Sequence, residues 1–172
     1  MSRLWLARHA EAAPGGMELS AIGRRQAELL GKRLTGAGIT RISHSPLPRA
    51  VQTASIVAAA LPGVPVVAAE ELTDSDPTED PAAAEAMVAR FADPPADELC
   101  ITHMFQVGWF VRAVLDAPAA RWSALNSANT GVTVLRWSAT PGVPVSPLVF
   151  NDVTHLPPEL RWTGFPPELR LP

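Results

Sequence analysis

The sequence predicts an α/β protein, a three-layer α/β/α sandwich built around a mostly parallel central sheet. Two observations predict this fold class. Short apolar runs typical of buried strands alternate along the chain with segments whose apolar residues recur at helical spacing. Three of the predicted strands also end at charged or polar residues, as expected where the carboxyl ends of parallel strands form a site.

The first half of the chain contains three predicted strands and two predicted helices. Ser20 is a preferred N-cap residue, and Pro46 after Ser45 suits the first position of a helix. Glycines after each helical segment are typical helix ends. The expected elements are a strand at Leu4–Ala7, a helix from Ser20 to about Leu34, a strand at Ile39–Ser43, a helix from Ser45-Pro46 to about Ala60 and a strand at Val64–Val67.

The second half begins with an acidic stretch, Glu70–Pro81, that has one apolar residue besides its prolines and is expected to be a loop. After this stretch, segments with apolar residues at helical spacing alternate again with short apolar runs typical of strands. The expected elements are a short helix at Ala82–Phe91, a strand at Leu99–Thr102, a helix from Phe105 to about Leu115 and a strand at Thr130–Trp137.

The chain of 172 residues, 47% of them hydrophobic, is long enough for a real core. We expect residues 1–172 to form a single domain. Its proline-rich C-terminal segment, residues 141–172, contains a duplicated Pro-Pro-Glu-Leu-Arg and is expected to be extended and to wrap the surface.

Composition excludes several function classes. The net charge of −3 argues against a general binder of nucleic acid or of a membrane surface. Cys100 is the only cysteine, so an internal disulfide is not possible, and the four histidines show no zinc-site spacing. No apolar run has the length of a signal peptide or a membrane span. The sequence therefore predicts a cytoplasmic protein without a metal site.

Four residues follow the ends of predicted strands and suggest one chemistry. Arg8 and His9 follow the first strand, Arg49 lies just beyond the second, and His103 follows the fourth. Guanidinium groups match phosphate oxygens, and a helix N-terminus also attracts anions. Imidazoles can act as nucleophile, acid or base. The combination indicates a phosphoryl group attacked by a histidine.

Four sequence blocks in order resemble the histidine phosphatase superfamily, the phosphoglycerate mutase-like fold. They cover the strand with Arg8-His9, the following helix, the segment with Arg49 and the strand before His103. The blocks are Leu6–Glu11, Leu19–Ala27, Ser43–Ala54 and Ile101–His103. Parts of the chain also resemble the short bacterial phosphohistidine phosphatases, notably Glu71-Leu72-Thr73 and Val107-Gly108.

The resemblance implies a role for each matched residue. His9 would attack phosphorus and carry the phosphoryl group, and water would release it. Arg8, Arg49 and His103 would bind the phosphate oxygens and stabilise the transition state. No cofactor is implied.

The general acid is the residue that the sequence identifies least. Many members of the family place a glutamate in the loop after the third strand. By position Glu71 is the first candidate, with Asp74 and Asp76 behind it, and a phosphohistidine substrate would need no carboxylate acid.

Four functions remain open. The leading one is a metal-independent phosphatase that hydrolyses a phosphorylated small molecule. The second is a protein phosphohistidine phosphatase. A mutase is disfavoured because the chain lacks insertions that would enclose the substrate. The fourth is a pathway or binding protein that keeps the phosphate pocket without turnover. The sequence identifies neither the substrate nor the oligomeric state.

Overall fold

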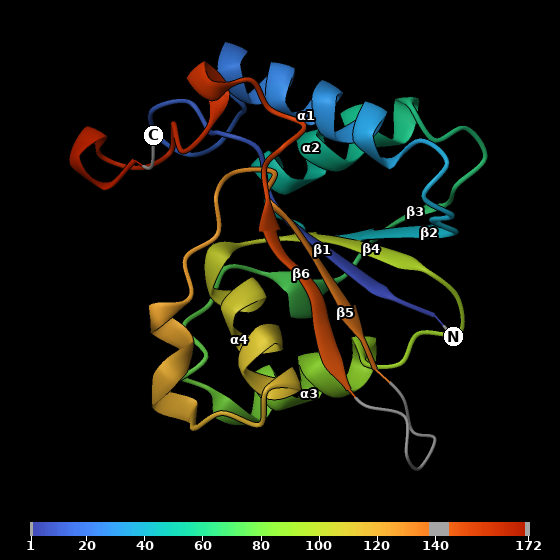
Figure 1. Cartoon of the computed structure of the whole chain (residues 1–172), viewed down its shortest axis with the longest axis vertical. Helices are drawn as coiled ribbons and strands as arrows, with labels where there is room; N and C mark the ends of the chain where they lie inside the picture. Colours follow the sequence, from blue (N-terminus) through green and yellow to red (C-terminus); the bar gives the residue numbers. More distant parts are fainter. Residues whose placement is uncertain (1, 138–144, 171–172) are drawn as a thin grey trace.

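Helices cover both faces of a six-stranded sheet in the computed structural model, which describes residues 2–137 and 145–170. Helices α1 and α2 lie on one face, and α3 and α4 lie on the other (Figure 1). The strands are β1 (Leu4–Arg8), β2 (Arg41–His44), β3 (Val66–Ala68), β4 (Glu98–Thr102), β5 (Val132–Arg136) and β6 (Ser146–Asp152). The helices are α1 (Ala21–Leu34), α2 (Pro48–Ala59), α3 (Pro81–Phe91) and α4 (Met104–Val114).

The sheet has the order β3-β2-β4-β1-β5-β6. The pairs β3–β2, β2–β4 and β4–β1 are parallel, whereas β5 pairs antiparallel with β1 and β6 pairs antiparallel with β5. The predicted three-layer fold with a mostly parallel sheet is therefore confirmed. The four parallel strands are those whose carboxyl ends can share one site.

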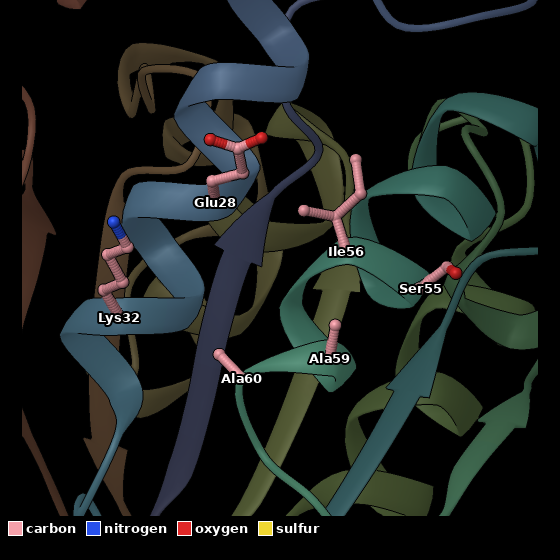
Figure 2. A pocket seen from close by; sticks show the side chains of 6 residues that line it. All are labelled: Glu28, Lys32, Ser55, Ile56, Ala59 and Ala60. Carbon is pink, nitrogen blue, oxygen red and sulfur yellow. The ribbon is translucent and has the colours of Figure 1, made fainter.

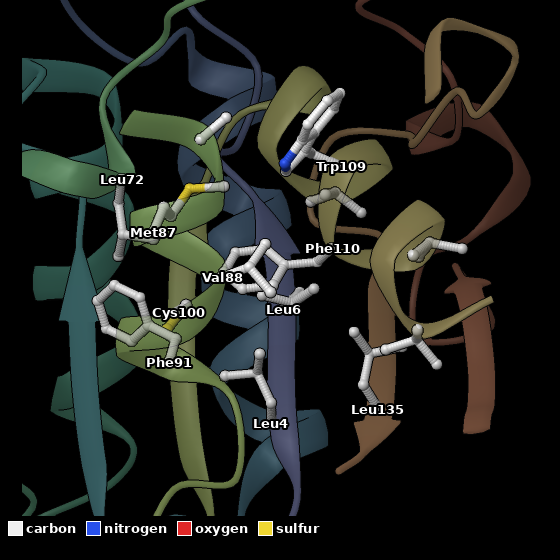
Figure 3. Packing of buried hydrophobic residues seen from close by; sticks show 14 of the residues in the cluster. Leu4, Leu6, Leu72, Met87, Val88, Phe91, Cys100, Trp109, Phe110 and Leu135 are labelled. Carbon is white, nitrogen blue, oxygen red and sulfur yellow. The ribbon is translucent and has the colours of Figure 1, made fainter. Parts of the chain in front are cut away.

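Strand β1 shows why the first apolar run is continuous. Leu4 and Leu6 belong to the core between the sheet and helices α3 and α4 (Figure 3). Trp5 belongs to the second core, which lies under α1 and α2. Because successive side chains point to opposite faces, a strand covered on both faces must be apolar at every position.

Most predicted elements are present, with boundaries that differ by one or two residues. Ser20 caps α1 as expected, since its side chain accepts a hydrogen bond from the Gly23 backbone. Helix α2, by contrast, begins at Pro48 with Leu47 as its N-cap, two residues later than predicted. The prediction failed because Ser45 and Pro46 are a turn before the helix, and the Ser45 hydroxyl faces a histidine of the site.

The sequence did not predict β6, which lies within the segment expected to wrap the surface. Pro147 is tolerated there because β6 is an edge strand, where one unmade backbone hydrogen bond costs little. Beyond β6, two short 3₁₀ helices follow at Pro158–Leu160 and Pro167–Leu169. Residues 141–144 and 171–172 of the predicted segment lie outside the described residues.

The loop after His9 packs closely against the first turn of α1. A Cβ added at Gly23 would lie 2.0 Å from the backbone oxygen of Glu11. We predict that Gly23→Ala destabilises the fold by about 1–3 kcal/mol, although alanine is the better helix former by about 1 kcal/mol. Urea denaturation measures the change.

The exposed neighbour Arg24 provides the control for helix propensity. Arg24→Ala should change the free energy of unfolding by less than about 0.5 kcal/mol. A Gly23→Ala variant as stable as the wild type would show that the loop after His9 is free to move away.

Candidate active site

The pairing of β1 with β4 brings two histidines together. Arg8, the last residue of β1, is in register with Thr102, the last residue of β4. His9 and His103 follow these residues directly, and their ring centroids lie 5.1 Å apart. The His9 backbone N–H donates to the Thr102 oxygen at 2.8 Å, which extends the ladder by one step. The sheet register therefore sets the distance between the two imidazoles.

His9 is held in one tautomer. Its Nδ1 lies 2.8 Å from the backbone oxygen of Ala10, and because a carbonyl can only accept, Nδ1 carries the proton. The lone pair is then on Nε2, to which Arg49 Nε donates at 3.1 Å. Asn129 Nδ2 donates to the His9 backbone oxygen at 2.8 Å. His9 is 7% exposed, so its ring is largely shielded from solvent.

His103 lies between a hydroxyl and two charged groups. Its Nε2 is 2.8 Å from Ser45 Oγ, which also accepts from the Leu47 backbone N–H at 3.2 Å. Its Nδ1 is 3.3 Å from Arg49 Nη2 and 3.6 Å from Asp74 Oδ2. Nδ1 can accept from the guanidinium when the ring is neutral and can donate to an anion when it is protonated.

Burial makes both imidazoles neutral at pH 7. Burial is the main cause that lowers the pKa of His9 to about 3, with a further contribution from the neighbouring Arg8 and Arg49 cations. Burial, followed by the same two cations, also lowers the pKa of His103 to about 3. Burial lowers the pKa of Arg8 to about 10, which leaves it charged at pH 7. The site is thus cationic through its arginines, and its two imidazoles are uncharged.

Arg8 is fixed from two sides by segments far away in the sequence. Its Nη1 donates to the Ser127 backbone oxygen at 2.9 Å. Its guanidinium carbon lies 5.2 Å from the centre of the Phe165 ring. The C-terminal segment therefore forms one side of the site, and Phe165 covers the Arg8 guanidinium there.

The three candidates for the general acid lie in different places. Asp74 lines the same pocket as Arg8, His9 and His103, and its carboxylate accepts from Arg49 Nη2 at 2.6 Å. Glu71, the first candidate from the sequence, instead lines a separate pocket. Asp76 Oδ1 accepts from the backbone and hydroxyl of Thr78. In an irregular loop, sequence position gave no information on which carboxylate points inward, and the inward one is Asp74.

The pocket has a volume of about 170 Å³. Its lining consists of Arg8, His9, Asp74, His103, Met104 and Phe105. This volume suits a phosphoryl group, whereas pockets for whole drug-sized ligands start at about 300 Å³.

A larger hollow of about 520 Å³ lies between α1 and α2 (Figure 2). Its lining contains one carboxylate, Glu28, and one ammonium group, Lys32, besides small and apolar side chains. It brings together no set of groups that could perform chemistry.

Across residues 2–137 and 145–170, no group of three or more His, Cys, Asp or Glu side chains could hold a metal ion. None of the helices formed by these residues is long and apolar enough to cross a membrane.

Sequence reasoning missed three residues of the site: Ser45, Asn129 and Phe165. Ser45 was interpreted as a helix cap, and its position directly after the second strand was the available signal. Asn129 and Phe165 contact the site from a loop and from the C-terminal segment. Neither lies in a local pattern that marks function.

The lowered pKa values of the two buried histidines predict acid sensitivity. In the unfolded chain a histidine has a pKa of about 6.5, so below that pH the unfolded state binds protons that the folded state does not. The contribution to stability is complete above pH 6.5 and is lost as the pH falls toward 3. In His103→Asn, the decrease in unfolding free energy between pH 6.5 and 4.5 should be smaller by about 2 kcal/mol. Urea denaturation at several pH values measures it, and a wild-type-like decrease would contradict the assignment.

Comparison with known proteins shows which family these residues resemble. The model of the histidine phosphatase superfamily (branch 1) matches residues 4–79, which include Arg8, His9 and Arg49. The serine/threonine-protein phosphatase PGAM5 of Rattus norvegicus is 29% identical over 91% of this chain, and that of Homo sapiens is 28% identical. The chain spans 64% of the length of these relatives.

Solved structures share the fold. A putative α-ribazole-5′-P phosphatase from Escherichia coli superimposes with a TM-score of 0.73 at 20% identity, covering 88% of this chain and 98% of its own. A phosphoserine phosphatase mutant from Entamoeba histolytica gives a TM-score of 0.71 at 20% identity, with coverages of 91% and 100%. The N-terminal blocks thus match the model of the histidine phosphatase superfamily over residues 4–79, and the solved structures share the fold.

Proposed function

We propose that this protein is a metal-independent phosphatase that hydrolyses a phosphomonoester through a phosphohistidine intermediate on His9. The observation that carries the proposal is the hydrogen bond from His9 Nδ1 to the Ala10 oxygen, because it leaves the Nε2 lone pair facing Arg49. The low pKa of His9, about 3, keeps this nitrogen unprotonated at physiological pH.

In the first step His9 Nε2 attacks phosphorus, a P–N bond forms and the P–O bond to the leaving group breaks. The guanidinium groups of Arg8 and Arg49 would bind the equatorial oxygens, where they stabilise the charge that the transition state spreads over them. A bound dianion also favours the protonated form of His103, whose Nδ1–H could then donate to a phosphate oxygen.

Asp74 is our candidate for the general acid. In the free protein its carboxylate accepts from Arg49 Nη2. A phosphate that takes over this contact would release the carboxyl group from Arg49. In its protonated form Asp74 would then give a proton to the departing alkoxide.

In the second step water attacks the phosphohistidine, and the Asp74 carboxylate accepts a proton from the water. The P–N bond breaks, which returns His9 to its neutral form and gives inorganic phosphate. Acid and base are thus the same group used in opposite directions.

The substrate beyond the phosphate is open between a small molecule and a protein. The names of the relatives, a serine/threonine-protein phosphatase, a phosphoserine phosphatase and a putative α-ribazole-5′-P phosphatase, support a phosphomonoester of either kind. A protein phosphohistidine phosphatase is the alternative, as is a pathway protein without turnover. Phosphate release from a panel of phosphometabolites, phosphoserine peptides and phosphohistidine peptides distinguishes these functions.

The covalent step gives the sharpest prediction. Labelled substrate mixed with enzyme and quenched in alkali should leave label on the peptide that contains Arg8-His9, because a phosphoramidate survives base and is labile in acid. His9→Ala should lose both label and turnover. His155→Ala, which changes a partly buried histidine outside the pocket, should retain them. Label on another residue, or inversion at a chiral phosphate, would disprove the mechanism.

The acid is tested with two substrates. Asp74→Asn should slow an alkyl phosphate by up to about 10²–10⁴-fold and a nitrophenyl phosphate much less, because nitrophenolate leaves without protonation. The substrate comparison separates proton transfer from the loss of the contact with Arg49, which affects both substrates. Steady-state kinetics of Glu71→Gln provides the comparison with the other candidate. A selective effect in Glu71→Gln rather than Asp74→Asn would reverse the assignment.

A further inference from the structure

The two arginines of the site are held in different ways. Arg49 Nη2 is bound to the Asp74 carboxylate, which a phosphate replaces in the reaction that we propose. Arg8 instead contacts the backbone oxygen of Ser127 and the ring of Phe165. Neither of these two groups carries a net charge. Arg8 therefore keeps its whole positive charge for an incoming phosphate.

An aromatic ring suits this position. The guanidinium carbon of Arg8 lies over the Phe165 ring, 5.2 Å from its centre, within the distance of about 6 Å at which a ring face attracts a cation. The ring also shields the guanidinium from water, which strengthens the attraction between Arg8 and a phosphate. An arginine side chain that is already held in place loses less conformational freedom when an anion binds. The contact thus prepares Arg8 for phosphate without neutralising it.

The part of the chain that carries Phe165 lies beside α1 and is attached to it (Figure 1). The buried Gln26 of α1 donates through Nε2 to the Leu160 backbone oxygen at 2.8 Å and to Thr163 Oγ1 at 3.0 Å. Its Oε1 accepts from the Glu11 backbone N–H at 2.9 Å. One amide therefore joins the C-terminal part of the chain to the loop that follows the first histidine of the site.

Three further contacts fix the ring itself. Gly164 lies so close to Asn129 that a Cβ added at this glycine would be 2.1 Å from Asn129 Oδ1. Arg170 Nε donates to the Phe165 backbone oxygen at 2.8 Å. The Trp162 ring packs edge-on against the Phe165 ring, with 5.3 Å between their centroids. The surrounding chain therefore sets the position of the ring, and the ring can in turn hold the arginine.

We propose that Phe165 is a positioning residue of the phosphate pocket. Its ring holds the Arg8 guanidinium in place for the phosphate oxygens and leaves the charge of that group available. This inference rests on the proposed function and adds a residue from the C-terminal part of the chain to the site. The ring acts through Arg8, so it strengthens the binding of any phosphate, whatever the rest of the substrate is.

The test replaces the ring in three ways. Phe165→Ala should raise the KM for nitrophenyl phosphate and the Kd for inorganic phosphate by about fivefold to tenfold. Phe165→Leu keeps an apolar side chain without a ring face and should behave like the alanine variant. Phe165→Tyr keeps the ring and should stay within about twofold of the wild type. Steady-state kinetics measures KM, and isothermal titration calorimetry measures Kd.

Two more variants locate the effect. Phe150→Ala removes a phenyl ring from edge strand β6, where it is 41% exposed, and should leave KM and Kd unchanged. Arg170→Ala removes the contact with the Phe165 backbone and should raise both constants by a smaller factor than Phe165→Ala does. A merely structural role would lower the amount of active enzyme, and hence the apparent kcat, without changing KM or Kd.

The two proposals can fail separately, because the titration does not depend on turnover. If the wild-type protein binds phosphate and does not hydrolyse nitrophenyl phosphate, the proposed function is wrong, and the affinities of the variants still decide the role of Phe165. If the wild type is active and Phe165→Ala binds phosphate as tightly, the positioning role is wrong. Equal affinities of Phe165→Leu and Phe165→Tyr would also overturn it, because the ring face would then contribute nothing.

Discussion

The parallel pairing of β1 with β4 is the constraint on which the site depends. Its register fixes the distance between His9 and His103, because each histidine is the first residue after its strand. Both strands are buried on both faces, so a slip by one residue would exchange the side chains that pack in the two cores. Packing of the two cores therefore stabilises the strand register, and this register sets the positions of the two imidazoles. No flexible loop separates either histidine from the sheet.

The charge of the site depends on the arginines Arg8 and Arg49, which lie next to the neutral imidazoles of His9 and His103. Burial disfavours the charged form of each imidazole, and repulsion by the Arg8 and Arg49 cations adds to this effect. The pKa values of both histidines are therefore lowered to about 3. In the free protein the Asp74 carboxylate is the anion nearest to Arg49 Nη2 and His103 Nδ1. A phosphate supplies more negative charge to the same donors. In the reaction that we propose, substrate binding and the release of the carboxyl group would therefore be one exchange rather than two events.

Apolar runs and helical spacing predicted the four parallel strands and the four helices, although β3 has only three residues and all of them are exposed. They also predicted the edge of the sheet at which Arg8, His9 and His103 meet. Periodicity could not rank Asp74 above Glu71 as the carboxylate of the pocket. The loop has no regular spacing, so a residue's position in the sequence does not tell which carboxylate points inward. Edge strand β6 was missed because its proline and its exposure hide the strand pattern. Phe165 could not be found, since its contact with Arg8 depends on the tertiary fold alone.

The segment around Asp74 must satisfy two requirements. In the reaction that we propose, Asp74 would leave Arg49 when phosphate binds, which requires that its side chain can move, and that side chain is 38% exposed. The backbone on either side has to stay in place, because it holds the carboxylate at the wall of the phosphate pocket. The hydrogen bonds at Leu72 and Ser75 meet the second requirement without restricting the first, since both use backbone oxygens. A backbone that is held on both sides of a partly exposed carboxyl group suits the role of general acid and base that we propose for Asp74.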